Sequence, residues 1–230
     1  MSSTYLTPAH DLQPPSEVMT STQAPSETAR TERIGFYIDG YNVYYGLRQK
    51  GFRRYYWLDY RALANAFVHP HQILARVKYF TSRISGPDDS RKRQSTYLDA
   101  LAARGGLTII EGRIERRPVK CPACDHRWRR PEEKKTDVAI ATNLVADAHR
   151  DLIDTAMLLC ADADLVPAVQ EVRSIGKRVI VISPRGRTSD ELTAEADHHL
   201  HINKSRLGRC QLPDEIESNG VTLRRPPEWS

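Results

Sequence analysis

Short apolar segments alternate with amphipathic segments along most of this chain, and this alternation constrains the fold more than any other feature. Residues 34–38, 155–160 and 178–182 are apolar at nearly every position, which is typical of strands buried on both faces. The segment 137–150 instead repeats its apolar residues at i, i+3, i+4 and i+7, the spacing of one helix face. Such alternation predicts an α/β fold, with a parallel sheet and helices on both of its faces.

The same patterns predict the order of the elements. We expect strands at 34–38, 77–80, 107–111, 155–160, 178–182 and 200–202, and helices at 42–51, 61–68, 89–104, 137–150, 165–175 and 189–196. Residues 113–135 interrupt this rhythm and are interpreted as an insertion between a strand and the next helix. The expected domain spans residues 33–205.

The two ends of the chain differ in composition from this domain. Residues 1–32 are rich in Ser, Thr, Pro and Gln, so they cannot bury enough apolar surface to offset the conformational entropy lost on folding. Residues 206–230 combine prolines with charged residues. We therefore expect a disordered tail at each end.

Charge and hydropathy limit the classes of function. The net charge is +5, and Arg and Lys cluster near 92–93, 113–117 and 127–135. Such clusters suit a polyanionic partner, although each could also be a solvated surface. No apolar run approaches the ~20 residues of a membrane span, and the first residues lack a secretory pattern. We expect a cytoplasmic protein without membrane contact.

Aspartates stand where the predicted strands end. Asp39 ends one apolar run, Asp162 follows another, and Asp164 comes two residues later. Because the carboxyl ends of parallel strands share one edge of the sheet, we expect these side chains to meet there with Asp137, at the start of a helix. Oxygen ligands select hard ions such as Mg²⁺ or Mn²⁺, so the cluster predicts a divalent metal site. The alternative is that each aspartate caps a helix, which would explain Asp137 best.

Three motifs follow one another along the chain: residues 36–42 read FYIDGYN, 135–141 read KTDVAIA, and 159–167 read LCADADLVP. They resemble, in this order, the opening signature, the second motif and the third motif of the NYN domain family of PIN-like nucleases. Weaker similarity continues through 176–179 and 196–197, so the resemblance covers residues 33–203.

This resemblance implies a Rossmann-like, PIN-type fold and a metal-dependent endoribonuclease that uses Mg²⁺ or Mn²⁺ to hydrolyse RNA. The residues that match metal-binding or catalytic acids of the family are Asp39, Asp137 and Asp162, with Asp164 as a further acid and Asp197 at a weaker acidic position. Asn42 matches the signature asparagine, which would orient an acid or the substrate. Asn143 stands where many relatives have a second acid, and this amide weakens the case for two tightly held metals.

Two other classes of function compete with the nuclease. A non-catalytic NYN domain could bind RNA or a protein in a regulatory role, and metal-dependent cleavage would separate the two. A phosphatase of the haloacid dehalogenase type also uses strand-end aspartates. That chemistry needs an acid two residues after the nucleophile, where this chain has Tyr41 after Asp39, so the sequence argues against it. Homo-oligomerisation is left open.

Cysteines, histidines and tyrosines supply further candidates. The insertion contains Cys121 and Cys124, which are half of a structural zinc site and would need His126 or a second chain to complete it; the alternative is a reduced, exposed pair. The tract His198, His199 and His201 is interpreted as a polar edge strand rather than a metal site. The tyrosines Tyr41, Tyr44 and Tyr45 would stack on bases or pack in the core. Lys92 and Arg93 would contact phosphates or face solvent.

Overall fold

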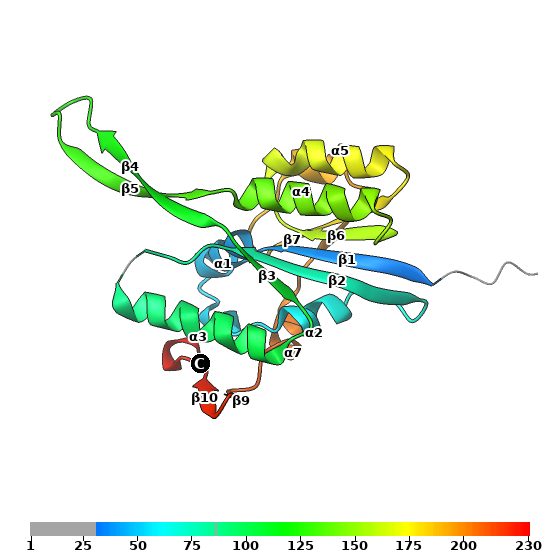
Figure 1. Cartoon of the computed structure of the whole chain (residues 1–230), viewed down its shortest axis with the longest axis horizontal. Helices are drawn as coiled ribbons and strands as arrows, with labels where there is room; N and C mark the ends of the chain where they lie inside the picture. Colours follow the sequence, from blue (N-terminus) through cyan, green and yellow to red (C-terminus); the bar gives the residue numbers. More distant parts are fainter. Residues whose placement is uncertain (1–30, 86) are drawn as a thin grey trace, which may run out of the picture. The chain divides into compact units, whose positions relative to one another are not determined.

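The structure is a computed structural model that describes residues 31–85 and 87–230 (Figure 1). The predicted tail at 1–32 thus lies outside the described residues, apart from its last two. The first strand, β1 (Glu32–Asp39), begins there. None of the described helices is both long and apolar enough to cross a membrane.

Six parallel strands form the central sheet, in the order β3-β2-β1-β6-β7-β8. Besides β1 they are β2 (Gln72–Thr81), β3 (Thr108–Glu111), β6 (Thr155–Leu159), β7 (Arg178–Ser183) and β8 (His198–His201). The chain runs outward from β1 to β3, returns to β6 beside β1, and runs outward again to β8. The order therefore reverses between β1 and β6, where open α/β sheets have their ligand crevice. The predicted parallel α/β fold is confirmed.

Helices cover both faces of the sheet because neighbouring residues of each strand point to opposite sides. Phe36 and Ile38 pack in one core with α1 (Gly40–Gln49), α2 (Tyr60–Asn65), α3 (Asp88–Arg104) and α7 (Lys204–Arg209). Tyr37 packs in the other core with α4 (Thr136–His149), α5 (Val166–Ser174) and α6 (Asp190–Ala194). Single-turn helices η1 (Arg53–Tyr55) and η2 (Ala163–Leu165) follow α1 and β6.

A buried polar network joins the sheet to α4. The Lys78 ammonium on β2 forms an ion pair with the Asp147 carboxylate at 2.6 Å, and the Tyr37 hydroxyl on β1 donates to the same carboxylate at 2.8 Å. Lys78 also donates to Asn143 Oδ1 at 2.9 Å. Because an unpaired buried charge is strongly destabilising, this network fixes α4 against β1 and β2.

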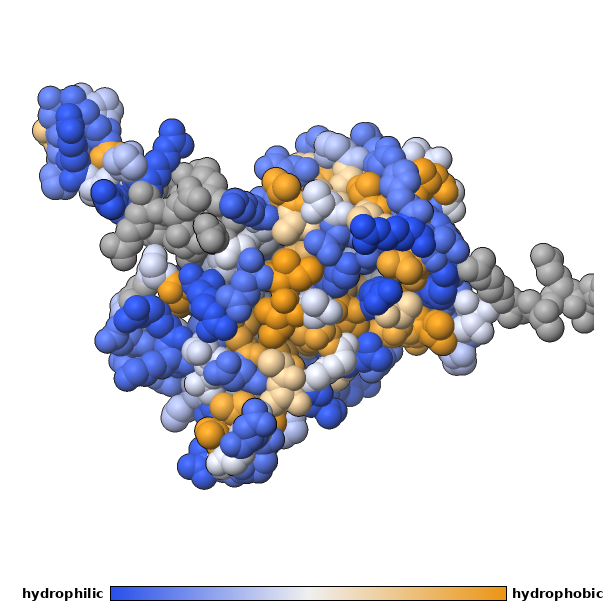
Figure 2. Space-filling model, viewed as in Figure 1, coloured by the Kyte–Doolittle hydropathy of each residue, from blue (hydrophilic) through white to orange (hydrophobic). Residues whose placement is uncertain are grey.

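Residues 113–135, predicted as an insertion, form a hairpin outside the central sheet. Its strands β4 (Arg113–Lys120) and β5 (Arg127–Lys134) pair antiparallel along their whole length. The hairpin extends away from the sheet (Figure 1). The described part of its surface is mostly hydrophilic (Figure 2).

The C-terminal residues correct the sequence expectation. Residues 206–230, predicted to be a disordered tail, belong to the same compact unit as the domain. They include β9 (Glu215–Ser218), β10 (Val221–Arg224) and η3 (Pro227–Trp229). The Trp229 ring packs against Tyr56 and Tyr97, with centroid distances of 5.6 and 5.9 Å. The prediction was wrong because prolines and charges surround the few apolar anchors, whose partners lie far away in the sequence.

The polar network gives a stability prediction. Asp147→Asn keeps the shape of the side chain but removes the charge that neutralises Lys78, so we expect the free energy of unfolding to fall by about 3 kcal/mol. Urea unfolding measures the change. The control is Glu215→Gln, which removes a carboxylate paired with Arg224 at the surface and should leave the unfolding midpoint unchanged. Equal midpoints for the two variants would contradict the role of the network.

Candidate functional site

The Asp39 carboxylate is buried at the carboxyl end of β1, with 2% of the residue exposed. Its Oδ1 accepts the backbone amide of Asn42 at 2.9 Å and so caps α1. Its Oδ2 accepts the Asn42 side-chain amide and, at 3.4 Å, the Cys160 thiol. Gly40 follows Asp39 in the chain, and a Cβ atom at this position would lie 2.7 Å from the Phe80 carbonyl oxygen. Only glycine lets α1 begin this close to β2.

The electrostatics of this carboxylate are unusual. Burial raises the pKa of Asp39 above its usual range, and the neighbouring charge of Asp162 adds to that rise, while the hydrogen bonds from Asn42 and Cys160 oppose it. The Asn42 Oδ1 atom is also buried and has no hydrogen-bond partner. A buried oxygen without a donor, beside two carboxylates that repel one another, is a donor set that a hard divalent cation fits.

The other predicted acids lie nearer the surface. Asp162 follows β6 and accepts the backbone amide of Asp164 at 3.1 Å, which caps η2. Asp164 is exposed, and so is Asp137 in the first turn of α4. The start of α4 reaches the same edge of the sheet, because Thr136 Oγ1 lies 3.4 Å from the Ser82 hydroxyl beyond β2.

The structure thus brings Asp39 and Asp162 together, with Asp137 and Asp164 at the rim. Among the residues that the structure describes, no three His, Cys, Asp or Glu side chains are gathered as a metal cluster. The predicted four-acid metal site therefore stays a prediction. Helix capping accounts for part of the geometry of both residues.

Two polar residues matched to the family lie away from this pair. The side chain of Asn143 is held by Lys78 and by the Ala139 carbonyl, so an aspartate there would face an ammonium group. Asp197 accepts the backbone amide of Val179 at 2.8 Å, at the amino end of β7. In a parallel sheet the amino ends of all strands lie opposite their carboxyl ends, where Asp39 is found. Asp197 and Asp39 therefore cannot bind the same metal ion.

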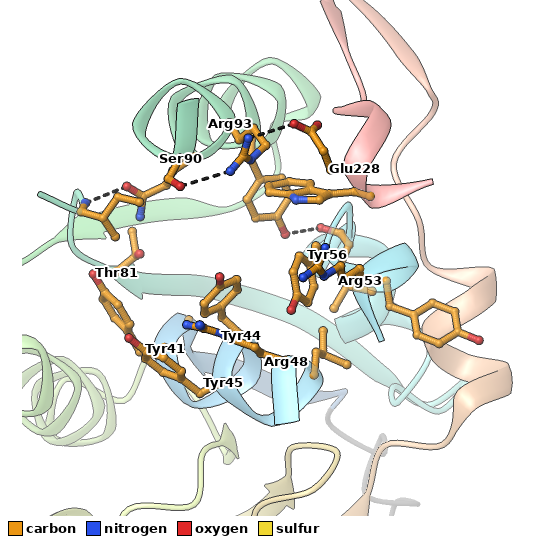
Figure 3. A pocket seen from close by; sticks show the side chains of 18 of the residues that line it. Tyr41, Tyr44, Tyr45, Arg48, Arg53, Tyr56, Thr81, Ser90, Arg93 and Glu228 are labelled. Carbon is orange, nitrogen blue, oxygen red and sulfur yellow. Dashed lines mark hydrogen bonds and ion pairs between the residues drawn. The ribbon is translucent and has the colours of Figure 1, made fainter. Parts of the chain in front are cut away.

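A pocket of about 650 Å³ opens beside the acidic edge. Gly40 and Tyr41, which follow Asp39, and Thr81, which ends β2, are part of its wall, although none of the four acids lines it. Figure 3 shows Tyr41, Tyr44, Tyr45 and Arg48 of α1 on one side, with Arg93 of α3 and Glu228 of η3 on the other. The pocket thus lies on the α1–α3 face of the sheet.

Aromatic rings dominate this pocket. Tyr44 and Tyr45 are 39% and 41% exposed, and their ring centroids lie 5.3 Å apart. The Tyr45 ring also stacks on Tyr41 at 6.0 Å, and Tyr44 contacts Tyr56 at 5.0 Å. These rings are partly solvent-exposed at the pocket wall, which favours the base-stacking interpretation over a place in the core.

Arginines add positive charge to the pocket. Arg93, one of the predicted phosphate contacts, forms an ion pair with Glu228 at 2.9 Å and donates to Ser90 at 3.1 Å (Figure 3). Arg48 and Arg53 form no ion pair within the described part of the chain, so they remain available to an anion. Lys92, the other predicted contact, is exposed and does not line the pocket.

The remaining candidates lie elsewhere. The histidine tract forms β8, an edge strand of the sheet, as predicted, and His199 Nε2 lies 2.8 Å from the Ser183 hydroxyl. Cys121 and Cys124 lie in the turn of the β4–β5 hairpin, outside both the acidic edge and the pocket.

Several residues near the acids and the pocket were not predicted from the sequence. The direct contact of Cys160 with Asp39 could have been anticipated, since this residue ends a predicted strand. Arg48, Tyr56 and Trp229 line the pocket but had no sequence signal, because their convergence depends on how α1, η1 and η3 pack.

Comparisons with known proteins identify the family of this chain. The family model described as NYN domain matches residues 33–203. The chain is 30% identical to 6-hydroxy-3-succinoylpyridine 3-monooxygenase HspA of Pseudomonas putida, covering 89% of this chain and 76% of HspA. It is 22% identical to the low amplitude and bright protein LabA of Synechococcus elongatus, covering 84% of this chain and 96% of LabA.

A solved structure shares the fold. A crystal structure of a protein of unknown function from Vibrio parahaemolyticus superposes with a TM-score of 0.52 at 21% identity, covering 76% of this chain and 94% of that chain. The family match spans the whole sheet, from β1 to β8, and includes every acid at its carboxyl edge. The chain therefore belongs to the NYN domain family, within the PIN-like nucleases.

Proposed function

We propose that this protein is a metal-dependent endoribonuclease that hydrolyses RNA phosphodiester bonds at the edge occupied by Asp39 and Asp162. The observation that carries the proposal is the buried Asp39 carboxylate, whose pKa is raised by burial and further by the charge of Asp162, beside the unpartnered Asn42 Oδ1. Membership of the PIN-like nucleases supports the same reaction. Asp137 and Asp164, at the rim, are the further candidate ligands.

Three residues would form and position the proposed metal site. Asp39 and Asp162 would hold Mg²⁺ or Mn²⁺, and Asn42 would keep the Asp39 carboxylate in place through its two hydrogen bonds. The bound ion would supply a water of lowered pKa and offset the negative charge of the scissile phosphate. Of the two roles that the resemblance implies for Asn42, orienting an acid or the substrate, these hydrogen bonds support the first.

The pocket would bind the RNA strand next to the cleavage site. Tyr44 and Tyr45 offer faces for unpaired bases, and Arg48 and Arg53 offer charge for phosphates. Contacts of this kind recognise the backbone and the flat faces of bases, so they predict cleavage of single-stranded RNA with weak sequence preference.

A second candidate function comes from HspA, whose name describes a monooxygenase of a hydroxypyridine compound. The specific observation in its favour is the tyrosine-lined pocket with Arg48 and Arg53, which would also suit a small aromatic anion. Such a reaction would need O₂ and a two-electron reductant as co-reactants. Consumption of 6-hydroxy-3-succinoylpyridine without any cleavage of RNA would favour this candidate over the nuclease.

The nuclease proposal predicts a large effect of one charge. Asp39→Asn should lower RNA cleavage with Mn²⁺ by about 100-fold or more, because it removes a ligand that acts on the reacting phosphate. The assay uses purified protein and mixed RNAs, with Mn²⁺ or with chelator. Asp214→Asn is the matched control, since the Asp214 side chain is 79% exposed, and it should cleave like the wild type.

Two outcomes of this assay would reject the proposal. Equal cleavage by the wild type and Asp39→Asn would identify a contaminating nuclease. Cleavage by neither protein over a broad panel of RNAs would favour the non-catalytic, RNA-binding alternative.

The same substitution has a predicted pH signature in metal-free protein. Because the pKa of Asp39 is raised above its ordinary value of 3.8 in the folded state, its ionised form destabilises the fold at neutral pH. Asp39→Asn should therefore be as stable as the wild type or more so at pH 7. This advantage should shrink as the pH falls through the raised pKa towards 3.8. Thermal midpoints measured in chelator test the trend, and a difference that is independent of pH would contradict it.

The pocket gives a separate prediction for RNA affinity. Tyr45→Ala should weaken the binding of single-stranded RNA about tenfold, since each stacked base contributes ~1–3 kcal/mol. Binding is measured in chelator, so that no strand is cut. The control is Ile73→Ala, which also removes a half-exposed apolar side chain but lies at the amino end of β2. Equal losses in both variants would place RNA outside the pocket.

A further inference from the structure

The turn that joins β4 to β5 has a defined geometry around its two cysteines. The Cys121 backbone amide donates to the His126 carbonyl at 2.8 Å, and the Asp125 amide donates to the Cys121 carbonyl at 3.1 Å. Asp125 has a φ of 56°, a left-handed conformation that reverses the chain after the second cysteine. The turn is therefore closed by its own backbone, without help from the rest of the domain.

This closure brings the two thiols together. Hydrogen bonding to the Ala123 and Cys124 backbone amides and to the Cys124 thiol lowers the pKa of the Cys121 thiol. Two sulfur ligands of one tetrahedral zinc ion lie about 3.8 Å apart, given Zn–S bonds of about 2.3 Å. A pair of adjacent sulfurs on a short turn, with amides directed at one of them, thus supplies one half of a tetrahedral thiolate site.

The described residues do not supply the other half. Cys160 and Cys210 are buried in the domain, where Cys160 contacts Asp39. The His126 ring lies against Trp128, with centroids 5.9 Å apart and planes within 19°. In the part of the chain that the structure describes, no third His, Cys, Asp or Glu joins the two cysteines as a metal group. Structural zinc sites need four protein ligands, so two positions stay unfilled by the residues that the structure describes.

We propose that the tip of the β4–β5 hairpin binds one Zn²⁺ shared between two copies of this chain, each contributing Cys121 and Cys124. A tetrahedral site of four sulfurs has a two-fold axis that relates one pair to the other, so two identical turns complete it without any new ligand. The hairpin also holds its tip away from the central sheet (Figure 1), which allows two tips to meet without a clash between the domains.

Charge favours this arrangement over direct contact of the tips. Arg127 and Arg129 are exposed cations beside the turn, and Lys120 forms an ion pair there with Asp125 at 2.8 Å. Two such tips would repel one another. One Zn²⁺ and four thiolates carry a net charge of 2 − 4 = −2, which offsets that repulsion. Binding releases the four thiol protons to solvent.

Zinc stoichiometry and mass together test the proposal on the full-length, reduced protein. After chelation and dialysis, titration with ZnCl₂ should end at about half a zinc per chain, because four thiolates from two chains share each ion. Light scattering should show the mass double from that of a 26.2 kDa chain at the same end point. Substitution by Co²⁺ should give the absorption of a tetrahedral four-thiolate site.

Variants in the turn complete the experiment. Cys121→Ser should abolish zinc uptake and the doubling of mass, whereas Pro122→Ala, which keeps both thiols, should retain them. Far-UV circular dichroism and thermal midpoints check that Cys121→Ser stays folded. One zinc per chain, zinc uptake without a doubling of mass, or no uptake at micromolar zinc would each overturn the proposal. These readouts do not involve RNA, so they succeed or fail independently of the proposed nuclease.

Discussion

Burial of the Asp39 carboxylate at the end of the central strand carries a desolvation cost, and the surrounding structure is organised to offset it. The first turn of α1 directs the Asn42 amide groups at both carboxylate oxygens, and the positive end of the helix dipole lies there as well. Gly40 permits this approach, because a side chain at that position would meet the Phe80 carbonyl. The remaining imbalance, with Asp162 nearby and Asn42 Oδ1 unpartnered, is what a divalent cation would relieve.

The same helix connects the acidic edge to the pocket. Its first turn holds Asp39, and its following turns contribute Tyr44, Tyr45 and Arg48 to the pocket wall (Figure 3). A strand bound along these side chains would approach the acids from the α1–α3 face. On the opposite face, the ion pair between Lys78 and Asp147 fixes the C-terminal part of α4. The contact between Thr136 and Ser82 places the start of that helix, with Asp137, at the same edge. The two faces thus serve different purposes: one presents rings and cations, and the other fixes an acid.

Asn143 stands where many relatives have an acid, and the structure explains this difference. Two turns into α4, its side chain accepts a hydrogen bond from Lys78, which is already neutralised by Asp147. An acid at this position would compete with Asp147 for one ammonium group. The amide is therefore consistent with a single cation centre near Asp39 and with a lysine that stabilises the interior instead of a second ion.

The sequence by itself determined the parallel sheet, the order of its strands and helices, and the position of Asp39 and Asp162 at its carboxyl edge. These features depend on local periodicity and on the rule that parallel strands share one edge, so a single sequence contains them. Only the tertiary structure decided that Trp229 packs on Tyr56 and Tyr97, that Asp197 lies at the opposite edge, and that the arginines of α1, η1 and α3 line one pocket. Each of these depends on contacts between segments far apart in the chain. Such contacts produce no periodic pattern in the local sequence, so a single sequence does not reveal them.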